Sequence, residues 1–183
     1  MTAWIALVHH PVVDREGALI TTAITNLDVH DIARSARTYD LPGYFLVTPI
    51  EAQRRLVERI LGHWRDGAGA RRVPERAEAL ARVEVVASME EAAARVEARA
   101  GAAPLSIVTS ARAGREATPY VEAARRCAER PAILWFGTGH GLAPVVMEQA
   151  DLVLPPIRGV AAYNHLSVRA AVAITLDRLF GGD

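Results

Sequence analysis

Apolar residues along this chain fall into short uninterrupted runs, separated by longer stretches of mixed polarity. Six runs are strand candidates: 4–10, 43–49, 82–88, 104–110, 132–136 and 151–155. Three of the stretches between these runs, 28–39, 50–63 and 89–100, and the stretch 164–180 after the last run have the pattern of helices. Strands that are apolar throughout and alternate with helices are typical of a mostly parallel sheet with helices on both faces. We therefore predict an α/β fold in which residues 1–183 form a single domain.

Two polar stretches, 67–76 and 110–119, interrupt this pattern and carry clustered arginines. Glycine and proline punctuate both stretches, so we expect two loops, the first of them mobile. Arginine forms planar, bidentate contacts with phosphate, which makes these side chains candidates for binding a phosphate-bearing partner. The candidates are Arg71, Arg72, Arg112 and Arg115, with Arg65 and Arg76 nearby.

Composition narrows the class of protein. All 21 basic residues are arginine and they balance 21 acidic residues, so phosphate binding would depend on local arginine clusters rather than on net charge. The single cysteine, Cys127, excludes an internal disulfide and lies in a helical stretch, where we expect a structural thiol. No apolar run approaches the roughly 20 residues of a membrane span, and the N-terminus lacks the basic region of a signal peptide. We expect a cytoplasmic protein.

Glycines recur at alternate positions directly after the strand candidate 132–136. Gly137, Gly139 and Gly141 lie in the sequence FGTGHGL. Glycines at the carboxyl end of a strand let the backbone approach a ligand closely, and α/β sheets bind ligands at that edge. The spacing GxGxG differs from the GxGxxG fingerprint of dinucleotide-binding proteins. Taken alone, the pattern is equally consistent with a glycine-rich turn.

The last segment of the chain combines a strand, a proline break, a glycine loop and a helix. The helix is apolar on two sides, with Val172 on one and Ala173 on the other, which predicts packing against both the sheet and a second subunit. Polar residues gather at its first turn, where free backbone N–H groups can hold a ligand. These residues are Tyr163, Asn164, His165 and Ser167. Capping of the helix explains one of them but not all four.

Three segments between residues 25 and 180 together resemble the SpoU-like branch of the SPOUT class of RNA methyltransferases. The sequence LWFGTGHGL resembles an FG-x-E-x-x-GL loop of that branch, and LPPIRG…YNHLSVRAAVA resembles its IPM…S-x-N-x-S-x-A-x-A strand, loop and helix. The sequence around HDIARSA is similar to its N-x-G-A-I-x-R-T-A helix, which aligns the motif arginine with Arg34. The sequence YNHLSVR resembles the signature of a small bacterial group within the class.

The resemblance implies a deep trefoil knot within residues 104–180, and S-adenosylmethionine (AdoMet) as the methyl donor bound in it. Three loops of the knot would hold AdoMet, mostly through backbone groups. Carried over to this chain, the cofactor-binding residues are Thr109, Gly137, Gly139, Gly141, Leu142, Leu154, Ile157, Gly159, Tyr163, Asn164 and Leu166. The class also implies a homodimer that forms through the last helix and completes the active site across its interface.

The resemblance further implies transfer of a methyl group to a nucleotide of tRNA or rRNA, at a ribose 2′-oxygen or at a base. The RNA would lie against the arginines Arg71, Arg72, Arg112 and Arg115. We expect Arg34 to grip a substrate phosphate and stabilise developing negative charge, because an arginine is too firmly protonated to act as a base. The candidate bases are His30, Asp31 and His165, and we assign His165 to catalysis together with Arg34.

Three positions depart from the class. Gly139 falls where the class has a glutamate, and Asp28 and His165 fall where it has asparagines. In the class these positions lie on the substrate side more than on the cofactor side, so the resemblance supports the methyl donor more firmly than the acceptor. Two other functions stay open: a non-catalytic AdoMet- or nucleotide-binding regulatory module, and a phosphate-binding enzyme that uses GTGHG as an anion nest. The pair His9–His10 lacks a carboxylate or cysteine partner at ligand spacing, so we predict no metal site.

Overall fold

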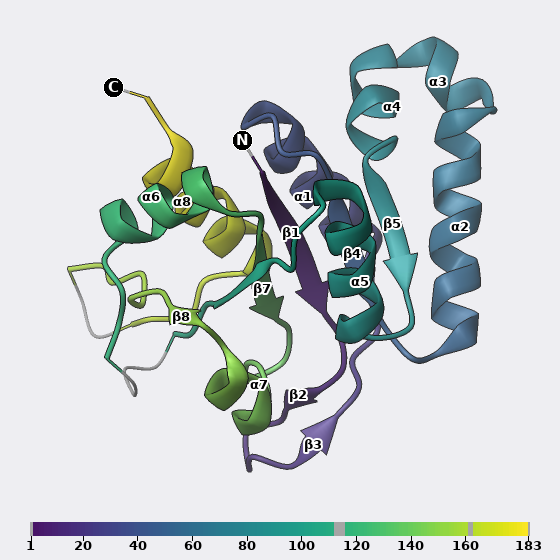
Figure 1. Ribbon diagram of the computed structural model, residues 1–183. Helices are drawn as coiled ribbons and strands as arrows, with labels where there is room; N and C mark the ends of the chain where they lie inside the picture. The colour runs from purple at the N-terminus through teal and green to yellow at the C-terminus, as the bar shows by residue number, and fades with distance from the viewer. Residues whose placement is uncertain (1, 112–115, 161–162, 183) are drawn as a thin grey trace.

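A six-stranded parallel sheet forms the centre of the protein (Figure 1). The computed structural model describes residues 2–111, 116–160 and 163–182. The strand order is β5-β4-β1-β7-β6-β8, and every neighbouring pair is parallel. The strands are β1 (Ala3–Val8), β4 (Tyr44–Val47), β5 (Val83–Val86), β6 (Leu105–Val108), β7 (Ala132–Gly137) and β8 (Leu152–Val153). Each overlaps a predicted run, and the predicted parallel α/β sheet is confirmed.

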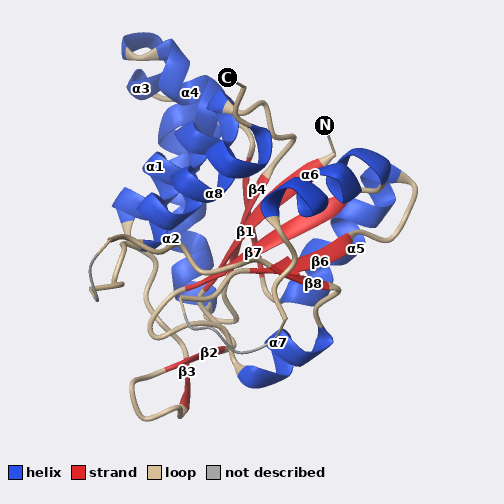
Figure 2. Cartoon of the chain, turned by 90° about the vertical axis from the view of Figure 1, so that its left-hand side faces the viewer, coloured by secondary structure: helices blue, strands red, loops and turns tan. Residues whose placement is uncertain are grey.

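Helices cover both faces of this sheet, as predicted. They are α1 (Asn26–Thr38), α2 (Glu51–Arg65), α3 (Ala68–Arg72), α4 (Pro74–Leu80), α5 (Met89–Ala100), α6 (Tyr120–Glu129), α7 (Pro144–Gln149) and α8 (Val168–Phe180). Alternate residues of β1 divide between the two faces. Ile5 and Leu7 are buried with residues of α1, α2, α4, α6 and α8, whereas Ala6 and Val8 are buried with residues of α5 and α7. Figure 2 shows α1 and α8 on one side of the sheet and α5 on the other.

Parallel pairing brings the carboxyl ends of the central strands level with one another. Val8 at the end of β1 lies opposite both Val47 of β4 and Gly137 of β7. On the other side of β7, Val108 of β6 lies opposite Trp135. The loops that follow these strands therefore meet at one edge of the sheet, which is where open α/β sheets bind their ligands.

A short antiparallel hairpin, β2 (Val12–Val13) and β3 (Leu19–Ile20), stands at this edge directly after β1. It is bonded to the loop that follows β7: His140 donates its backbone N–H to Val13 at 2.9 Å, and Val13 donates its own to Gly141 at 3.0 Å. Strands of two residues carry too little periodicity to be recognised in the sequence, so the hairpin was not predicted. The hairpin lies directly against the glycine loop.

The expectation of a mobile loop at residues 67–76 is wrong, because α3 and α4 occupy this stretch. Pro74 takes the first position of α4, where a missing N–H costs no hydrogen bond. Gly69 packs against the indole of Trp64, and a Cβ at this position would lie 2.9 Å from Trp64 Cε3. The guanidinium of Arg76 lies over the same ring, 5.4 Å from its centroid. Packing around Trp64 thus outweighs the low helix propensity of the glycines.

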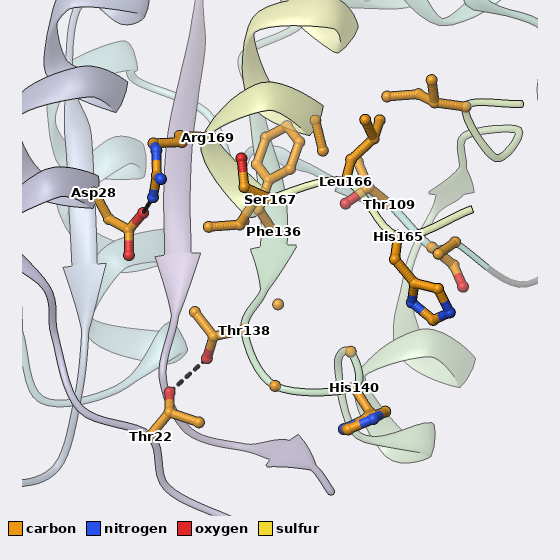
Figure 3. Close-up of a pocket in the computed structure, with 18 of the residues that line it drawn as sticks. Thr22, Asp28, Thr109, Phe136, Thr138, His140, His165, Leu166, Ser167 and Arg169 are labelled. Carbon is orange, nitrogen blue, oxygen red and sulfur yellow. Dashed lines mark hydrogen bonds and ion pairs between the residues drawn. The ribbon is translucent and has the colours of Figure 1, made fainter. Parts of the chain in front are cut away.

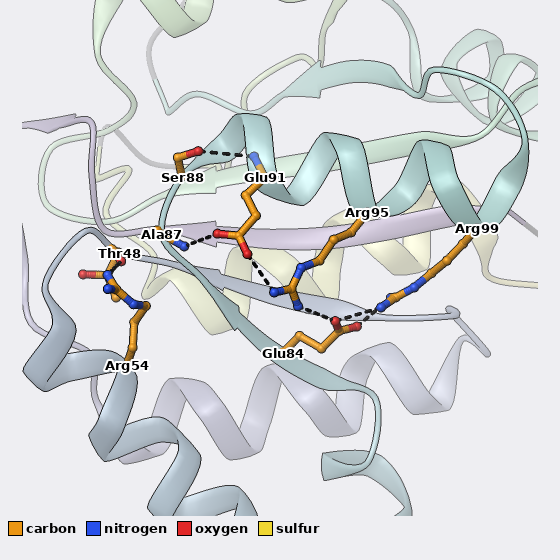
Figure 4. Close-up of polar contacts among 8 residues, drawn as sticks. All are labelled: Thr48, Arg54, Glu84, Ala87, Ser88, Glu91, Arg95 and Arg99. Carbon is orange, nitrogen blue, oxygen red and sulfur yellow. Dashed lines mark hydrogen bonds and ion pairs between the residues drawn. The ribbon is translucent and has the colours of Figure 1, made fainter.

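An ion-pair network fastens α5 to the edge strand β5, away from the glycine loop (Figure 4). The carboxylate of Glu84 accepts hydrogen bonds from Arg99 at 2.6 and 2.8 Å and from Arg95 at 2.8 Å. These bonds, Arg99 first, hold the pKa of Glu84 below its usual range. Arg54 donates to the carbonyl oxygen of Thr48 at 3.0 Å and so ties α2 to the end of β4. We regard these contacts as structural, because they join elements of the scaffold.

Among the described residues, the last helix, α8, is buried on the side that faces the sheet and only partly covered on its other side. Val172, Leu176 and Leu179 are buried against the sheet, while Ala173 and Ile174 on other sides are only half-buried. The helix packs against α1, α6 and β7, although it follows β8 at the far edge of the sheet. The dimer inferred from its second apolar side stays a prediction.

The structure bears on two expectations drawn from the composition, one for Cys127 and one for membrane-spanning segments. Cys127 is buried in α6, and burial raises the pKa of its thiol to about 11, as expected of a structural cysteine. Within the part of the chain that the structure describes, no helix is both long enough and apolar enough to cross a membrane.

Candidate functional site

A cavity of about 750 Å³ opens at the carboxyl edge of the central strands (Figure 3). Its volume lies within the range of small-molecule sites. The segments that follow β6, β7 and β8 line it, together with the first turns of α1 and α8. Apart from histidines, its charged side chains among the described residues are Asp28 and Arg169. The remaining lining is a mixture of hydroxyl, amide, glycine and apolar groups, suited to a ligand with both polar and apolar parts.

Each glycine of the loop after β7 is required for a different reason. A Cβ on Gly137 would lie 2.5 Å from the backbone nitrogen of Leu142, so the loop could not fold back on itself. Gly139 has φ +61°, and its Cβ would lie 2.9 Å from the carbonyl oxygen of Val13 in the hairpin. Gly141 has φ +116° and faces open space. The backbone conformation therefore explains glycine at 141, while chain packing explains glycine at 137 and contributes at 139.

A chain of side chains fastens the glycine loop to the hairpin segment. Thr138 Oγ1 donates its proton to the carbonyl oxygen of Val8 at 3.0 Å. Thr22 Oγ1, 2.5 Å from Thr138 Oγ1, must then donate to it (Figure 3), which leaves Thr22 to accept from His9 Nδ1 at 2.9 Å. A hydroxyl has only one proton to donate. The network thus places a proton on Nδ1 of His9.

His9 is fully buried at the end of β1. Burial lowers the pKa of its imidazole to about 4, and the nearby negative charge of Asp28 opposes this shift only in part. Its Nε2 has no hydrogen-bond partner among the described residues. Within the same ranges, no group of three or more His, Cys, Asp or Glu side chains is placed to hold a metal ion. His9 is best understood as a neutral anchor for Thr22.

Asp28 and Arg169 form a charged wall of the cavity, where the first turns of α1 and α8 meet. Arg169 Nη1 lies 3.2 Å from Asp28 Oδ1, and Arg169 Nε lies 3.6 Å from Asp31 Oδ2. Thr25 Oγ1 donates to the other carboxylate oxygen of Asp28 at 2.6 Å. The side chain of Asp28 is only 9% exposed, so its carboxylate is held in one orientation. Figure 3 shows the pair across the cavity from His140 and His165.

Hydrogen bonds tie the segment after β8 to the segment after β6. Asn164 Nδ2 donates to the carbonyl oxygen of Ala111 at 2.9 Å, and the Tyr120 hydroxyl donates to that of Pro155 at 3.2 Å. The two segments are far apart in the sequence but form one continuous side of the cavity. Asn164, expected to bind a ligand, thus also joins two of the loops.

The structure brings most of the predicted cofactor residues together. Eight predicted site residues line the cavity: Thr109, Gly137, Gly139, Gly141, Ile157, Asn164, His165 and Leu166. Leu142 and Leu154 are instead buried in the core next to it. Gly159 and Tyr163 line a smaller adjoining hollow of about 310 Å³, which shares Asn164 with the cavity.

The predicted acid–base and phosphate-binding residues of α1 lie beside the cavity rather than in its lining. Arg34 is 61% exposed, and its guanidinium lies 3.9 Å from the carboxylate of Asp31. Asp31 is also paired with Arg169, so a row of alternating charges leads from the cavity wall to Arg34 at the surface. His30 packs edge-on against Trp64, with ring centroids 5.4 Å apart.

The predicted phosphate-binding arginines are only partly described. Arg71 and Arg72 are exposed at the end of α3. Arg112 and Arg115 lie outside the described residues. Arg65 is exposed at the end of α2, where it pairs with Glu58 at 3.7 Å.

Sequence reasoning missed Arg169 and the part played by Asp28. Arg169 is the last residue of YNHLSVR, and nothing in the local pattern indicates that it reaches back to α1. Asp28 stood out only as a departure from a motif. Thr22 and Thr138 were missed as well, because their hydrogen bond joins segments 116 residues apart.

The fold is shared with SpoU/TrmH-type methyltransferases. The structure superposes on a TrmH/SpoU tRNA modifying enzyme from Aquifex aeolicus with a TM-score of 0.55 and 14% sequence identity, covering 97% of this chain and 73% of that one. It superposes on TrmJ from Z. mobilis with a TM-score of 0.58 and 16% identity, covering 98% and 68%. At such identities the likeness shows the fold alone.

Relatives found by sequence are much more similar to this chain than these two solved structures are. A tRNA (guanine-N(1)-)-methyltransferase from Nitratidesulfovibrio vulgaris is 49% identical over 176 residues, which are 96% of this chain and 41% of the relative. An uncharacterized protein from Aquifex aeolicus is 40% identical over 181 residues, covering 97% and 87%. The chain thus spans less than half of the named relative. Residues 2–181 match the family of SAM-dependent RNA methyltransferases, and the chain belongs to that family. The predicted family of RNA methyltransferases is confirmed, and AdoMet is the methyl donor of that family.

Proposed function

We propose that the cavity binds AdoMet and that the protein transfers the methyl group to a nucleotide of tRNA. The observation that carries this proposal is a single cavity built by the loops after β6, β7 and β8 in a member of an RNA methyltransferase family. The named relatives act on tRNA, which supports tRNA as the substrate. Because this chain spans 41% of those relatives, their guanine-N1 specificity is not carried over, and the methylated atom is left to experiment.

The lining residues suit AdoMet. Phe136, Ile157 and Leu166 offer apolar surface for an adenine ring, and the open backbone at Gly141 allows close contact with polar groups. AdoMet, when bound, supplies a methyl group activated by its sulfonium. The protein's part is to bind this donor, exclude water and position the acceptor.

Two measurements test the proposal. Calorimetry should show one AdoMet site per chain, with S-adenosylhomocysteine competing for it. Incubation with labelled AdoMet and total tRNA from cells lacking the gene should label tRNA, and mass spectrometry of its nucleosides should identify one methylated product. AdoMet binding without methylation of any RNA would favour a regulatory module. Absence of AdoMet binding would overturn the assignment of the cavity.

We infer that Arg34 and the arginines of α3 contribute differently to this reaction. Arg34 lies next to the cavity wall, so Arg34→Ala should leave AdoMet affinity unchanged but slow methyl transfer about a hundredfold through loss of an electrostatic stabiliser. Arg34→Lys should recover little, because an ammonium cannot reproduce a bidentate contact. Arg71→Ala should instead weaken tRNA binding modestly and reduce its salt dependence. Single-turnover rates and filter binding distinguish the two outcomes; full activity of Arg34→Ala would show a structural arginine.

We also propose that the chain forms a trefoil knot and that it belongs to the bacterial group with the YNHLSVR signature. A knot is supported by the path of the chain: β8 lies at the sheet edge, yet the chain returns from it to place α8 against α1 and β7. The segment after β8 lies against the segment after β6 through the bond from Asn164 to Ala111. When the two termini are pulled apart with optical tweezers, a knotted chain should extend less than its full contour length.

A homodimer through α8 is the third part of the proposal. It is supported by the half-buried residues Ala173 and Ile174 on a helix already packed on its other side. Ala173→Arg should yield monomers in sedimentation velocity, because it would bury an unpaired charge. Ala98→Arg, on the exposed side of α5, is the matched control and should leave the dimer intact. A wild-type monomer at micromolar concentration would contradict the dimer.

A further inference from the structure

We propose that Asp28 is the proton acceptor of the methyl-transfer step, with Arg169 and Thr25 positioning its carboxylate. This inference rests on the proposed function and deepens it, because it assigns to a residue of the cavity wall a role that no motif indicated. It replaces neither Arg34 at the surface nor the loops that bind the donor.

Methyl transfer to an oxygen or nitrogen that carries hydrogen requires a base. A lone pair of the acceptor forms the new bond to the methyl carbon, and the bond between carbon and sulfur breaks with its electron pair left on sulfur. The acceptor then holds one proton too many. This proton must pass to a group within hydrogen-bond reach, and a positioned side chain contributes roughly 10²–10⁴ in rate by receiving it. Asp28 receives the proton in this proposal, and water removes it after the products leave.

Asp28 is the one carboxylate among the described residues that line the cavity. Each of its oxygens accepts one hydrogen bond, Oδ1 from Arg169 at 3.2 Å and Oδ2 from Thr25 at 2.6 Å. A carboxylate oxygen has two lone-pair sites, so one on each oxygen stays available to a substrate. The carboxylate is thus fixed in place, nearly buried and still able to accept a proton.

The other candidate bases are placed less well. His140 and His165 have exposed side chains on the side of the cavity opposite Asp28 (Figure 3), where bulk water competes for their nitrogens. Asp31 is 45% exposed and lies outside the lining. His9 is neutral, and its Nδ1 is engaged with Thr22.

The charged partners of Asp28 indicate that its orientation is built into the fold. Arg169 comes from α8 and is itself held by Asp31, so the guanidinium bridges two carboxylates of α1. Thr25 is the N-cap of α1, where it accepts from the Asp28 backbone N–H at 3.2 Å and donates to the Asp28 carboxylate. A purely structural role would be to join α1 to α8. In that case Asp31, which pairs with the same arginine, would share this role.

The pairing of both aspartates with Arg169 provides a matched control. Asp28→Asn and Asp31→Asn make the same isosteric change, on the same helix and against the same arginine, but only Asp28 faces the cavity. The substrates are AdoMet and total tRNA from cells lacking the gene. We expect Asp28→Asn to slow single-turnover methylation roughly a hundredfold or more while the calorimetric Kd for AdoMet stays within about threefold of wild type. Asp31→Asn should keep most of the rate, and its change in Tm should be the smaller of the two because Asp31 is the more exposed residue.

A second variant separates a proton acceptor from a residue that only maintains the fold. Asp28→Ala leaves space for a small carboxylate, so added formate should restore part of its methylation rate and leave that of Asp28→Asn unchanged. Arg169→Gln keeps a neutral donor to Asp28 and should lower the rate less than Asp28→Asn, again with AdoMet affinity retained.

The outcomes distinguish this inference from the function on which it rests. Wild-type activity together with a full rate in Asp28→Asn overturns the inference alone. Equal losses in Asp28→Asn and Asp31→Asn, or a loss of AdoMet affinity that matches the loss of rate, also overturn it and assign Asp28 to the scaffold or to donor binding. Wild-type protein that binds AdoMet but methylates no tRNA overturns both the proposed function and the inference.

Discussion

Gly137→Ala should weaken AdoMet binding by roughly thirtyfold or more and lower the free energy of unfolding by about 1–3 kcal/mol, the cost of forcing extra atoms into a packed site. The added Cβ would lie 2.5 Å from Leu142 N and 2.8 Å from Gly141 C. Both are backbone atoms, and β7 is held by β1 and β6 on either side, so the loop must move rather than the strand. Loss of two or more backbone contacts to a ligand, at about 1 kcal/mol each, corresponds to roughly thirtyfold or more in Kd.

Gly62→Ala is the matched control for this change. Gly62 lies within α2, and a Cβ there would meet nothing within 4 Å. The same chemical change should therefore stabilise the protein by about 0.4–1 kcal/mol and leave AdoMet affinity unaltered. Calorimetry and urea unfolding of both variants test the pair. Wild-type AdoMet affinity in Gly137→Ala would show that the glycine loop takes no part in binding the donor.

The prediction for Gly137 illustrates what the sequence could and could not provide. Alternate glycines after an apolar strand correctly indicated a tight loop at the ligand-binding edge of the sheet, because backbone freedom is a local property. The reason for each glycine was not local. Gly139 is required by the carbonyl oxygen of Val13, which belongs to a hairpin that begins far earlier in the chain.

The same distinction explains which elements could be predicted. The six strands were recognisable because a parallel strand buried on both faces is apolar at successive positions, and β1 is buried throughout. Helices α3 and α4 were not, because their stability depends on packing around Trp64 rather than on propensity. The glycines and the proline of residues 67–76 predicted a loop, but tertiary contacts stabilise two helices there.

The contact between Asp28 and Arg169 in the cavity wall could not be predicted from the sequence. Arg169 and Asp28 are separated by 141 positions, and their pairing depends on the return of α8 to the centre of the fold. A motif comparison registers Asp28 as a departure and Arg169 as the last residue of YNHLSVR, and only the structure shows that the two side chains meet. Arg34, by contrast, was singled out by alignment alone, and the structure places it one ion pair further from the cavity than Arg169.

The pH dependence of stability should report on His9. The pKa of its imidazole is about 4 in the folded protein, against 6.5 in an unfolded chain. Between these values the unfolded chain binds a proton that the folded protein does not, so the free energy of unfolding decreases as the pH falls from 6.5 toward 4. The two pKa values correspond to a loss of about 3 kcal/mol over this interval. Protonation would also place a charge beside the half-buried Thr22–Thr138 hydrogen bond, so the glycine loop should loosen in the same range.

His9→Asn isolates this contribution. The amide nitrogen of asparagine occupies nearly the position of the histidine Nδ1 and can donate to Thr22, but it does not titrate. The variant should be less stable than wild type above pH 7, because a smaller side chain leaves a gap in the core. Below pH 6 the two stability curves should converge, since only the wild type loses stability through His9. Urea unfolding from pH 4.5 to 7.5 measures the difference between the curves, which cancels the titration of His30 and the other histidines. Parallel curves would show that folding does not lower the pKa of His9; its Nδ1–H would still donate to Thr22, because both nitrogens of an imidazolium are donors.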